Sequence, residues 1–202
     1  MIIGISGKMA VGKTTAAKIL QEINPALELK SFAGPLKDVA KMFLGDIDLS
    51  DQEVKASNLG EEWSTINPYQ SNAGWIGAKE TIEQQMTVRE FLQKLGTDAI
   101  RNGLHPNAWV NMLFKDYTNQ NWVIDDVRFP NEMNAIIKRG GVVIRMTRDD
   151  APKSYHASEI MLDMAKFDYY IDNNNTIATL RLILRSIMNG IHERDSKNQR
   201  GS

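Results

Sequence analysis

The stretch Gly7-Lys8-Met9-Ala10-Val11-Gly12-Lys13-Thr14-Thr15 decides the fold, because it follows the pattern of Gly, four residues and Gly-Lys-Ser/Thr. This is the spacing of a phosphate-binding loop (P-loop), in which glycines let the backbone wrap a polyphosphate with its N–H groups facing inward. Lys13 can then reach the β- and γ-phosphates, and Thr14 offers a hydroxyl to Mg²⁺. We therefore predict a site for a nucleoside triphosphate and Mg²⁺, and its residues are Gly7, Lys8, Ala10, Val11, Gly12, Lys13, Thr14 and Thr15.

The sequence on either side of this loop has the pattern that phosphate binding by a P-loop requires. Residues 1–6 form an apolar strand pattern, and residues 13–23 have the apolar spacing of a helix. Strand, glycine-rich turn and helix is the P-loop arrangement. The alternative, a glycine turn that binds nothing, does not explain this order.

Composition limits the function classes. The 202 residues suit one domain over residues 1–195, followed by a polar tail at 196–202 that we expect to be disordered and to include an expression remnant. A net charge of −1 and a pI near 6.3 provide no basic field, which argues against nucleic acid as a partner. There is no cysteine, and no apolar run approaches membrane-spanning length. We expect a cytoplasmic protein without membrane contact and leave a homodimer open.

Further elements alternate along the chain. Strand patterns occur at 26–32, 121–126, 141–147 and 169–171, and helix patterns at 35–44, from 87 onward, 106–117, 130–140 and 176–191. Five strands alternating with helices predict an α/β, three-layer fold of the P-loop NTPase type with a parallel five-stranded sheet. Two polar segments interrupt this pattern. We interpret residues 45–86 as an inserted substrate-binding flap and residues 148–160, with His156 and Glu159, as a lid.

A polar stripe marks the helix that begins after Thr87. Arg89, Gln93, Gly96 and Thr97 are spaced i, i+4, i+7 and i+8, which places them on one face of an α-helix. A glycine inside a helix costs about 1 kcal/mol relative to alanine, so Gly96 indicates a close approach by backbone or ligand. A substrate surface and an ordinary solvated face both fit this stripe.

A second group of polar residues follows the strand at 121–126. Asp125 and Asp126 end that strand, and an aspartate at this place in P-loop proteins holds the Mg²⁺ shell. We favour Asp126 together with Thr14 as the metal residues, with Asp125 as the competing ligand, since neighbouring strand residues point to opposite faces. Arg128 and Glu132 follow at the ligand edge, where a structural ion pair and a helix-dipole role are the alternatives.

Several strings resemble bacteriophage deoxynucleoside monophosphate kinases, which are P-loop nucleoside monophosphate kinase-like proteins. The resemblance spans residues 1 to about 180, and its strings are Ser31-Phe32-Ala33-Gly34-Pro35-Leu36-Lys37, residues 89–98, residues 126–132 and residues 156–159. It implies transfer of the γ-phosphate of ATP to a deoxynucleoside monophosphate (dNMP), giving a dNDP and ADP.

The chemistry that this resemblance implies needs no catalytic base, because a phosphate acceptor is mostly dianionic at neutral pH. The residues expected to act are Lys13, Arg89, Asp126, Arg128 and Glu132. The residues expected to contact or support the acceptor are Lys37, Arg89, Gln93, Gly96, Thr97, Trp109, Arg128 and Glu132. Two alternatives stay open, a kinase of another phosphorylated metabolite such as dephospho-coenzyme A, and a P-loop ATPase or switch that acts on a protein partner.

Overall fold

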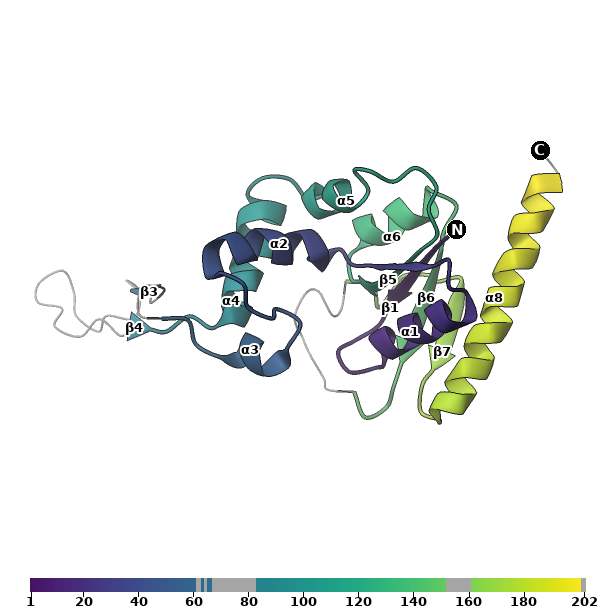
Figure 1. Cartoon of the computed structure of the whole chain (residues 1–202), viewed down its shortest axis with the longest axis horizontal. Coiled ribbons are helices and arrows are strands. Elements are labelled where there is room, and N and C mark those ends of the chain that lie inside the picture. Colours follow the sequence, from purple (N-terminus) through teal and green to yellow (C-terminus); the bar gives the residue numbers. More distant parts are fainter. Residues whose placement is uncertain (61–62, 64, 67–82, 152–160, 201–202) are drawn as a thin grey trace, which may run out of the picture. The chain divides into compact units, whose positions relative to one another are not determined.

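The computed structural model describes residues 1–60, 63, 65–66, 83–151 and 161–200. The chain divides into two compact units (Figure 1). The first unit comprises Met1–Pro35 and Trp109–Ser202, and the second comprises Leu36–Ala108. The second unit is thus larger than the insertion at 45–86 that the sequence indicates.

The first unit is built on a five-stranded parallel sheet. Its strands are β1 (Ile2–Ser6), β2 (Glu28–Lys30), β5 (Trp122–Val127), β6 (Val142–Thr147) and β7 (Tyr169–Asp172), in the order β2-β5-β1-β6-β7. The predicted α/β fold with a parallel five-stranded sheet is confirmed. Because β1 is the central strand, the loop that follows it emerges in the middle of the ligand-binding edge of the sheet.

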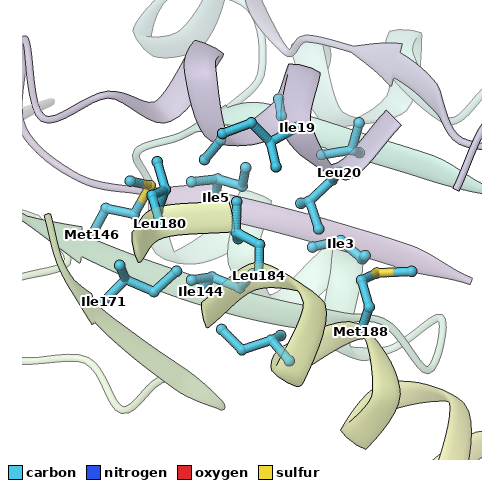
Figure 2. Close-up of a cluster of buried hydrophobic side chains, with 14 of the residues drawn as sticks. Ile3, Ile5, Ile19, Leu20, Ile144, Met146, Ile171, Leu180, Leu184 and Met188 are labelled. Carbon is cyan, nitrogen blue, oxygen red and sulfur yellow. The ribbon is translucent and has the colours of Figure 1, made fainter. Parts of the chain in front are cut away.

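Helices α1 (Lys13–Ile23) and α8 (Ile177–Arg200) cover one face of this sheet. Figure 2 shows Ile3 and Ile5 of β1 among leucine, isoleucine and methionine side chains from both helices and from β6 and β7. Helix α8 begins after Thr176, whose hydroxyl accepts a hydrogen bond from Thr179 N at 3.2 Å. It runs beyond Ile191, where we expect its end, so residues 196–200 are helical and not a disordered tail.

Helices α5 (Ala108–Leu113) and α6 (Pro130–Ile137) pack on the opposite face. Helix α5 is shorter than the pattern at 106–117 indicates, and α6 ends before Gly140, which adopts a left-handed conformation with φ 74°. The core on this face comprises Ile2, Phe32, Val110, Phe114, Trp122, Ile124, Val127, Met133, Ala135, Ile136, Val143 and Leu162. Both faces of the sheet are therefore covered, as a parallel sheet requires.

The second unit is mainly helical. Helix α2 (Ala33–Leu44) leads into it, and α3 (Gln52–Ala56), α4 (Val88–Gln93) and a π-helix, η2 (Lys94–Asn102), follow with the short strands β3 (Thr65–Ile66) and β4 (Glu83–Gln84). Its core contains Ala40, Leu49, Val88 and Phe91. The segment at 45–86, where the sequence shows weak periodicity, thus contains α3, which the Asp51 carboxylate caps by accepting from Glu53 N and Val54 N.

Parts of the predicted flap and lid lie outside the described residues. These are 61–62, 64, 67–82 and 152–160, and the last range includes His156 and Glu159. The two roles therefore stay predictions. Within the described part of the chain, every helix is too short or too polar to cross a membrane.

Candidate active site

The loop between β1 and α1 has the backbone conformation of a phosphate cradle. Ala10 and Gly12 adopt left-handed conformations, with φ 65° and 94°. Gly7 must be glycine because an added Cβ would lie 2.6 Å from the backbone oxygen of Met146. The Lys13 ammonium donates to Gly7 O and Lys8 O at 2.8 Å each, which holds the lysine against the loop that it serves.

Thr14 and Asp125 form the polar pair beside this loop. Thr14 Oγ1 donates to Asp125 Oδ2 at 2.7 Å, although 111 positions separate the two residues in sequence. Asp125 lies in the C-terminal half of β5, on the face that carries α1. Val123, two residues earlier on the same face of the strand, belongs to the core beneath α1 and α8. Burial raises the pKa of the Asp125 carboxyl above its ordinary value, opposed by the hydrogen bond from Thr14. A hydroxyl and a carboxylate therefore meet where α1 begins.

Asp126 holds a turn through its hydrogen bonds, and its assignment to the metal stays a prediction. Its Oδ2 accepts from Ser31 Oγ at 2.7 Å and Ala33 N at 2.9 Å, and its Oδ1 accepts from Phe32 N at 2.8 Å. Both oxygens are thus committed to the turn between β2 and α2. Its carboxylate holds that turn, and the contact with Thr14 belongs to Asp125.

A bulge in β5 separates the two aspartates. Gly4 pairs with Ile124 but Ser6 pairs with Val127, so β5 contains one residue more than β1 over this stretch. As a result Val127 belongs to the core beneath α6, and not to the core that contains Val123. Bulges of this kind re-aim side chains next to active sites.

Glu132 fixes the backbone that presents Arg128. The Glu132 carboxylate is buried, with 2% of the residue exposed, and its Oε2 accepts from Arg128 N at 2.8 Å and Phe129 N at 3.0 Å. It therefore satisfies two N–H groups where α6 begins. The half-buried Arg128 extends from the end of β5, at the edge of the sheet where the P-loop lies. Glu132 thus supports Arg128 through the Arg128 backbone.

Three residues that sequence reasoning missed support the loop from β6 and beyond. Arg145 donates to Ser6 Oγ at 3.1 Å and forms an ion pair with Asp163, and Asp163 also lies 3.5 Å from the Lys8 ammonium. Asn173 donates through Nδ2 to Val11 O at 3.0 Å. The one available signal was Arg145, a charge within an otherwise apolar strand pattern.

The predicted polar stripe lies in the second unit and is altered by the π-helix. Arg89 is exposed and donates to Gln52 Oε1 at 3.2 Å, Gln93 is exposed and Thr97 is half-buried. From Lys94 onward the α-helical spacing no longer applies, and Gly96 is buried, with an added Cβ 2.7 Å from Leu36 Cδ2. Gly96 is therefore needed for packing against Leu36, and its contact with a substrate stays a prediction.

Two further candidates have clear positions. Trp109 in α5 is buried, with 4% of the residue exposed, and its contact with the acceptor or support of the acceptor site stays a prediction. Lys37 is half-buried in the second turn of α2, since that helix starts at Ala33 and not at Pro35. Whether Lys37, Arg89, Gln93 and Thr97 contact the acceptor stays a prediction.

Comparison with known proteins identifies the family. The model of the family described as deoxynucleotide monophosphate kinase matches residues 49–183. A protein of Acanthamoeba polyphaga mimivirus that carries the same family name is 34% identical over 194 residues, which cover 88% of this chain and 90% of that protein. The deoxynucleotide monophosphate kinase of Enterobacteria phage T4 is 30% identical over 106 residues, 49% of this chain and 44% of that protein.

A solved structure supports the fold independently of sequence. Shikimate kinase from Aquifex aeolicus superposes with a TM-score of 0.50 at 11% identity, over 96% of this chain and 98% of that one. This similarity shows the fold alone, whereas the family match and the mimivirus relative show the family. The chain belongs to the deoxynucleotide monophosphate kinase family, and it is a kinase.

Proposed function

We propose that this chain transfers the γ-phosphate of ATP to deoxynucleoside monophosphates, with Mg²⁺ as the metal. The observation that carries the proposal is the 2.7 Å contact of Thr14 with Asp125 beside the Lys13 loop. In P-loop enzymes a hydroxyl at this loop position and an aspartate at the end of a neighbouring strand serve the metal. Family membership favours a dNMP acceptor over dephospho-coenzyme A and over a protein partner.

The residues present fit a magnesium ion of the P-loop kind. Mg²⁺ is bound through hard oxygen atoms, keeps several waters and takes one or two protein groups together with substrate phosphates. The Thr14 hydroxyl and the Asp125 carboxylate supply those oxygens, and the described residues contain no group of three acidic, histidine or cysteine side chains for an all-protein cage. When bound with ATP, the ion neutralises negative charge on the phosphates.

The chain's own residues supply position and positive charge. Lys13, held against the loop carbonyls, is placed to move onto the phosphates of ATP. Arg128, whose backbone Glu132 anchors, is proposed to bind the acceptor phosphate together with Arg89, because a planar guanidinium binds phosphate in a bidentate manner. No side chain has to remove a proton from the acceptor, since its phosphate is mostly dianionic at neutral pH.

A coupled assay of ADP formation tests the proposal. ATP is supplied with each dNMP, each ribonucleoside monophosphate, dephospho-coenzyme A or no acceptor. We expect ADP formation that depends on a dNMP. Equal rates with no acceptor would instead identify an ATPase, and a preference for dephospho-coenzyme A would identify a different kinase.

Substitutions of the two arginines test the acceptor site. Arg89→Lys and Arg128→Lys keep the charge but lose the bidentate geometry, so dNMP turnover should fall strongly while ATP affinity changes little. Lys18→Ala, on the exposed side of α1, is the control for loss of a surface cation. Unchanged dNMP kinetics in both arginine variants would remove these residues from the site.

A further inference from the structure

Asn173 connects the end of the sheet to the phosphate-binding loop. It directly follows β7, and its backbone N–H donates to Thr147 O at the end of β6 at 2.9 Å. Its side-chain Nδ2 donates to Val11 O at 3.0 Å, across 162 positions of sequence. One residue therefore ties the ends of two strands to the P-loop.

The loop is shaped to receive this amide. An added Cβ at Gly12 would lie 2.6 Å from Asn173 Nδ2, and the φ of Gly12 is 94°. Glycine is thus needed at this position both for its backbone conformation and for the approach of the asparagine side chain. The Asn173 amide occupies the space that any other residue at position 12 would fill.

The hydrogen bond to Val11 O also fixes a donor of the loop. Val11 O and Gly12 N–H belong to one peptide unit, which is planar and trans, so the two groups point in opposite directions. When Asn173 holds the carbonyl, the Gly12 N–H must point away from Asn173. A flip of this peptide would break the hydrogen bond from Asn173 Nδ2 to Val11 O. It would also turn the Gly12 N–H toward Asn173 Nδ2, so that two hydrogen-bond donors faced one another.

We propose that Asn173 is a positioning residue that orients the Gly12 N–H toward the phosphates of the nucleotide. The proposal rests on the proposed function, since it assumes that the loop binds phosphate. Asn173 acts through the peptide and touches neither the base nor the sugar. Backbone N–H groups set in advance around an anion avoid the cost of reorganisation during transfer.

The turn that carries Asn173 is itself held in place. Asn174 N donates to Asp172 Oδ1 at 3.2 Å, and Asn174 Oδ1 accepts from Asp149 N at 2.9 Å. Asn174 therefore stabilises the same turn through Asp149 and Asp172 and not through Val11, which makes Asn174→Ala a matched control. It separates loss of the Val11 contact from general loosening of the turn.

The experiment measures binding of inorganic tripolyphosphate and of ATP, both with Mg²⁺, by calorimetry. Asn173→Ala should weaken both by a similar factor of about ten, the size expected for one polar contact. Asn173→Asp is nearly isosteric but cannot donate and adds a negative charge, so it should weaken both further. Asn174→Ala should stay within about twofold of wild type, and the KM for a dNMP should be unchanged in all three.

Specific outcomes would overturn the inference. Normal tripolyphosphate binding by Asn173→Ala would contradict it, including the case in which only ATP binding is weakened, which would indicate a nucleoside contact. Equal weakening by Asn174→Ala would assign the effect to the turn as a whole. Melting temperatures show which variants are folded. Failure of the wild type to bind ATP or tripolyphosphate would instead refute the proposed function.

Discussion

Replacing Asp125 and Asp126 one at a time by asparagine separates a metal residue from a structural one. Asp126 accepts three hydrogen bonds, from Ser31 Oγ, Phe32 N and Ala33 N. An asparagine has one oxygen, so its NH₂ group must face at least one of these donors. Leaving a buried donor unpaired costs about 1–3 kcal/mol, and hydrogen bonds to a charged acceptor contribute about 1.5–3 kcal/mol. We expect Asp126→Asn to lower the free energy of unfolding by about 2–4 kcal/mol.

Asp125→Asn should have the opposite pattern. Its oxygen can still accept from Thr14 Oγ1, so the local hydrogen bond is kept. Burial raises the pKa of Asp125 in the folded chain. The contribution of this carboxyl to stability is therefore fully present below its unfolded pKa, where it is protonated, and is lost as pH rises through the folded pKa. At neutral pH the ionised carboxylate therefore costs stability, and the neutral asparagine removes that cost. Transfer should fall on the order of a hundredfold or more, since loss of one transition-state electrostatic contact costs about 3 kcal/mol.

Thermal melting and a magnesium titration of activity, run on both variants, distinguish these effects. For a chain of this length, a loss of 2–4 kcal/mol lowers the melting temperature on the order of 5–10 °C. Asp126→Asn should show that loss, with the magnesium dependence of the remaining activity close to wild type. Asp125→Asn should melt at or above the wild-type temperature and respond poorly to magnesium. A stable Asp126→Asn with an altered magnesium curve, or an unaltered curve for Asp125→Asn, would refute the assignment.

Three other changes have defined outcomes. Glu132→Ala removes the buried acceptor of two N–H groups and should lower the free energy of unfolding, measured with denaturant, by about 2–4 kcal/mol. Glu132→Gln keeps an acceptor oxygen and should retain most of the stability. Equal losses in the two variants would contradict the backbone role. Gly7→Ala should lower the melting temperature and weaken ATP binding because of the Met146 oxygen, whereas Gly34→Ala, with open space around its Cβ, should do neither. Hydrogen bonds from Thr87 lower the pKa of Glu90 in the folded chain. The ionised Glu90 therefore stabilises the fold above its unfolded pKa, near 4.5, and this stabilisation is lost as pH falls through the lower folded pKa. Glu90→Gln should flatten the acid side of a profile of melting temperature against pH, and a profile identical to wild type would contradict this.

The parts of the fold that local patterns dictate were predictable. Strand, glycine-rich turn and helix around Gly7 to Thr14 follow from adjacent residues, and the apolar runs at 121–126 and 141–147 are β5 and β6 as expected. The capping box at Thr87 and Glu90 is also present. These features depend on contacts between residues close in sequence, so pattern and propensity suffice to predict them.

The choice between Asp125 and Asp126 for the metal depends on register. Alternation shows that two adjacent aspartates face opposite sides, but only the pairing of β5 with β1 shows which side carries α1. The bulge after Ile124 adds a further change of direction that no local pattern marks. A choice between the two residues therefore required the sheet itself.

Packing and long-range contacts account for the other differences. The π-helix from Lys94 changes the spacing that placed Gly96 on a substrate face, and Leu36 explains its glycine. Arg145 contacts Ser6, the last residue of β1, from 139 positions away, and Asn173 contacts the loop from 162 positions away. Neither contact could be predicted from sequence spacing. The polar composition of the last residues gave no sign that α8 continues to Arg200. The inner face of this helix packs on the core through Leu184 and Ile191.

Transfer of the γ-phosphate itself tests the central claim most directly. The chain is incubated with Mg²⁺, a dNMP and ATP labelled at the γ-phosphate, and the labelled products are separated. We predict label in the dNDP for the wild type and for the surface control Lys18→Ala, and loss of at least about a hundredfold in rate for a folded Lys13→Ala. Label that appears only as inorganic phosphate, or a near-normal rate of dNDP formation by Lys13→Ala, would contradict it.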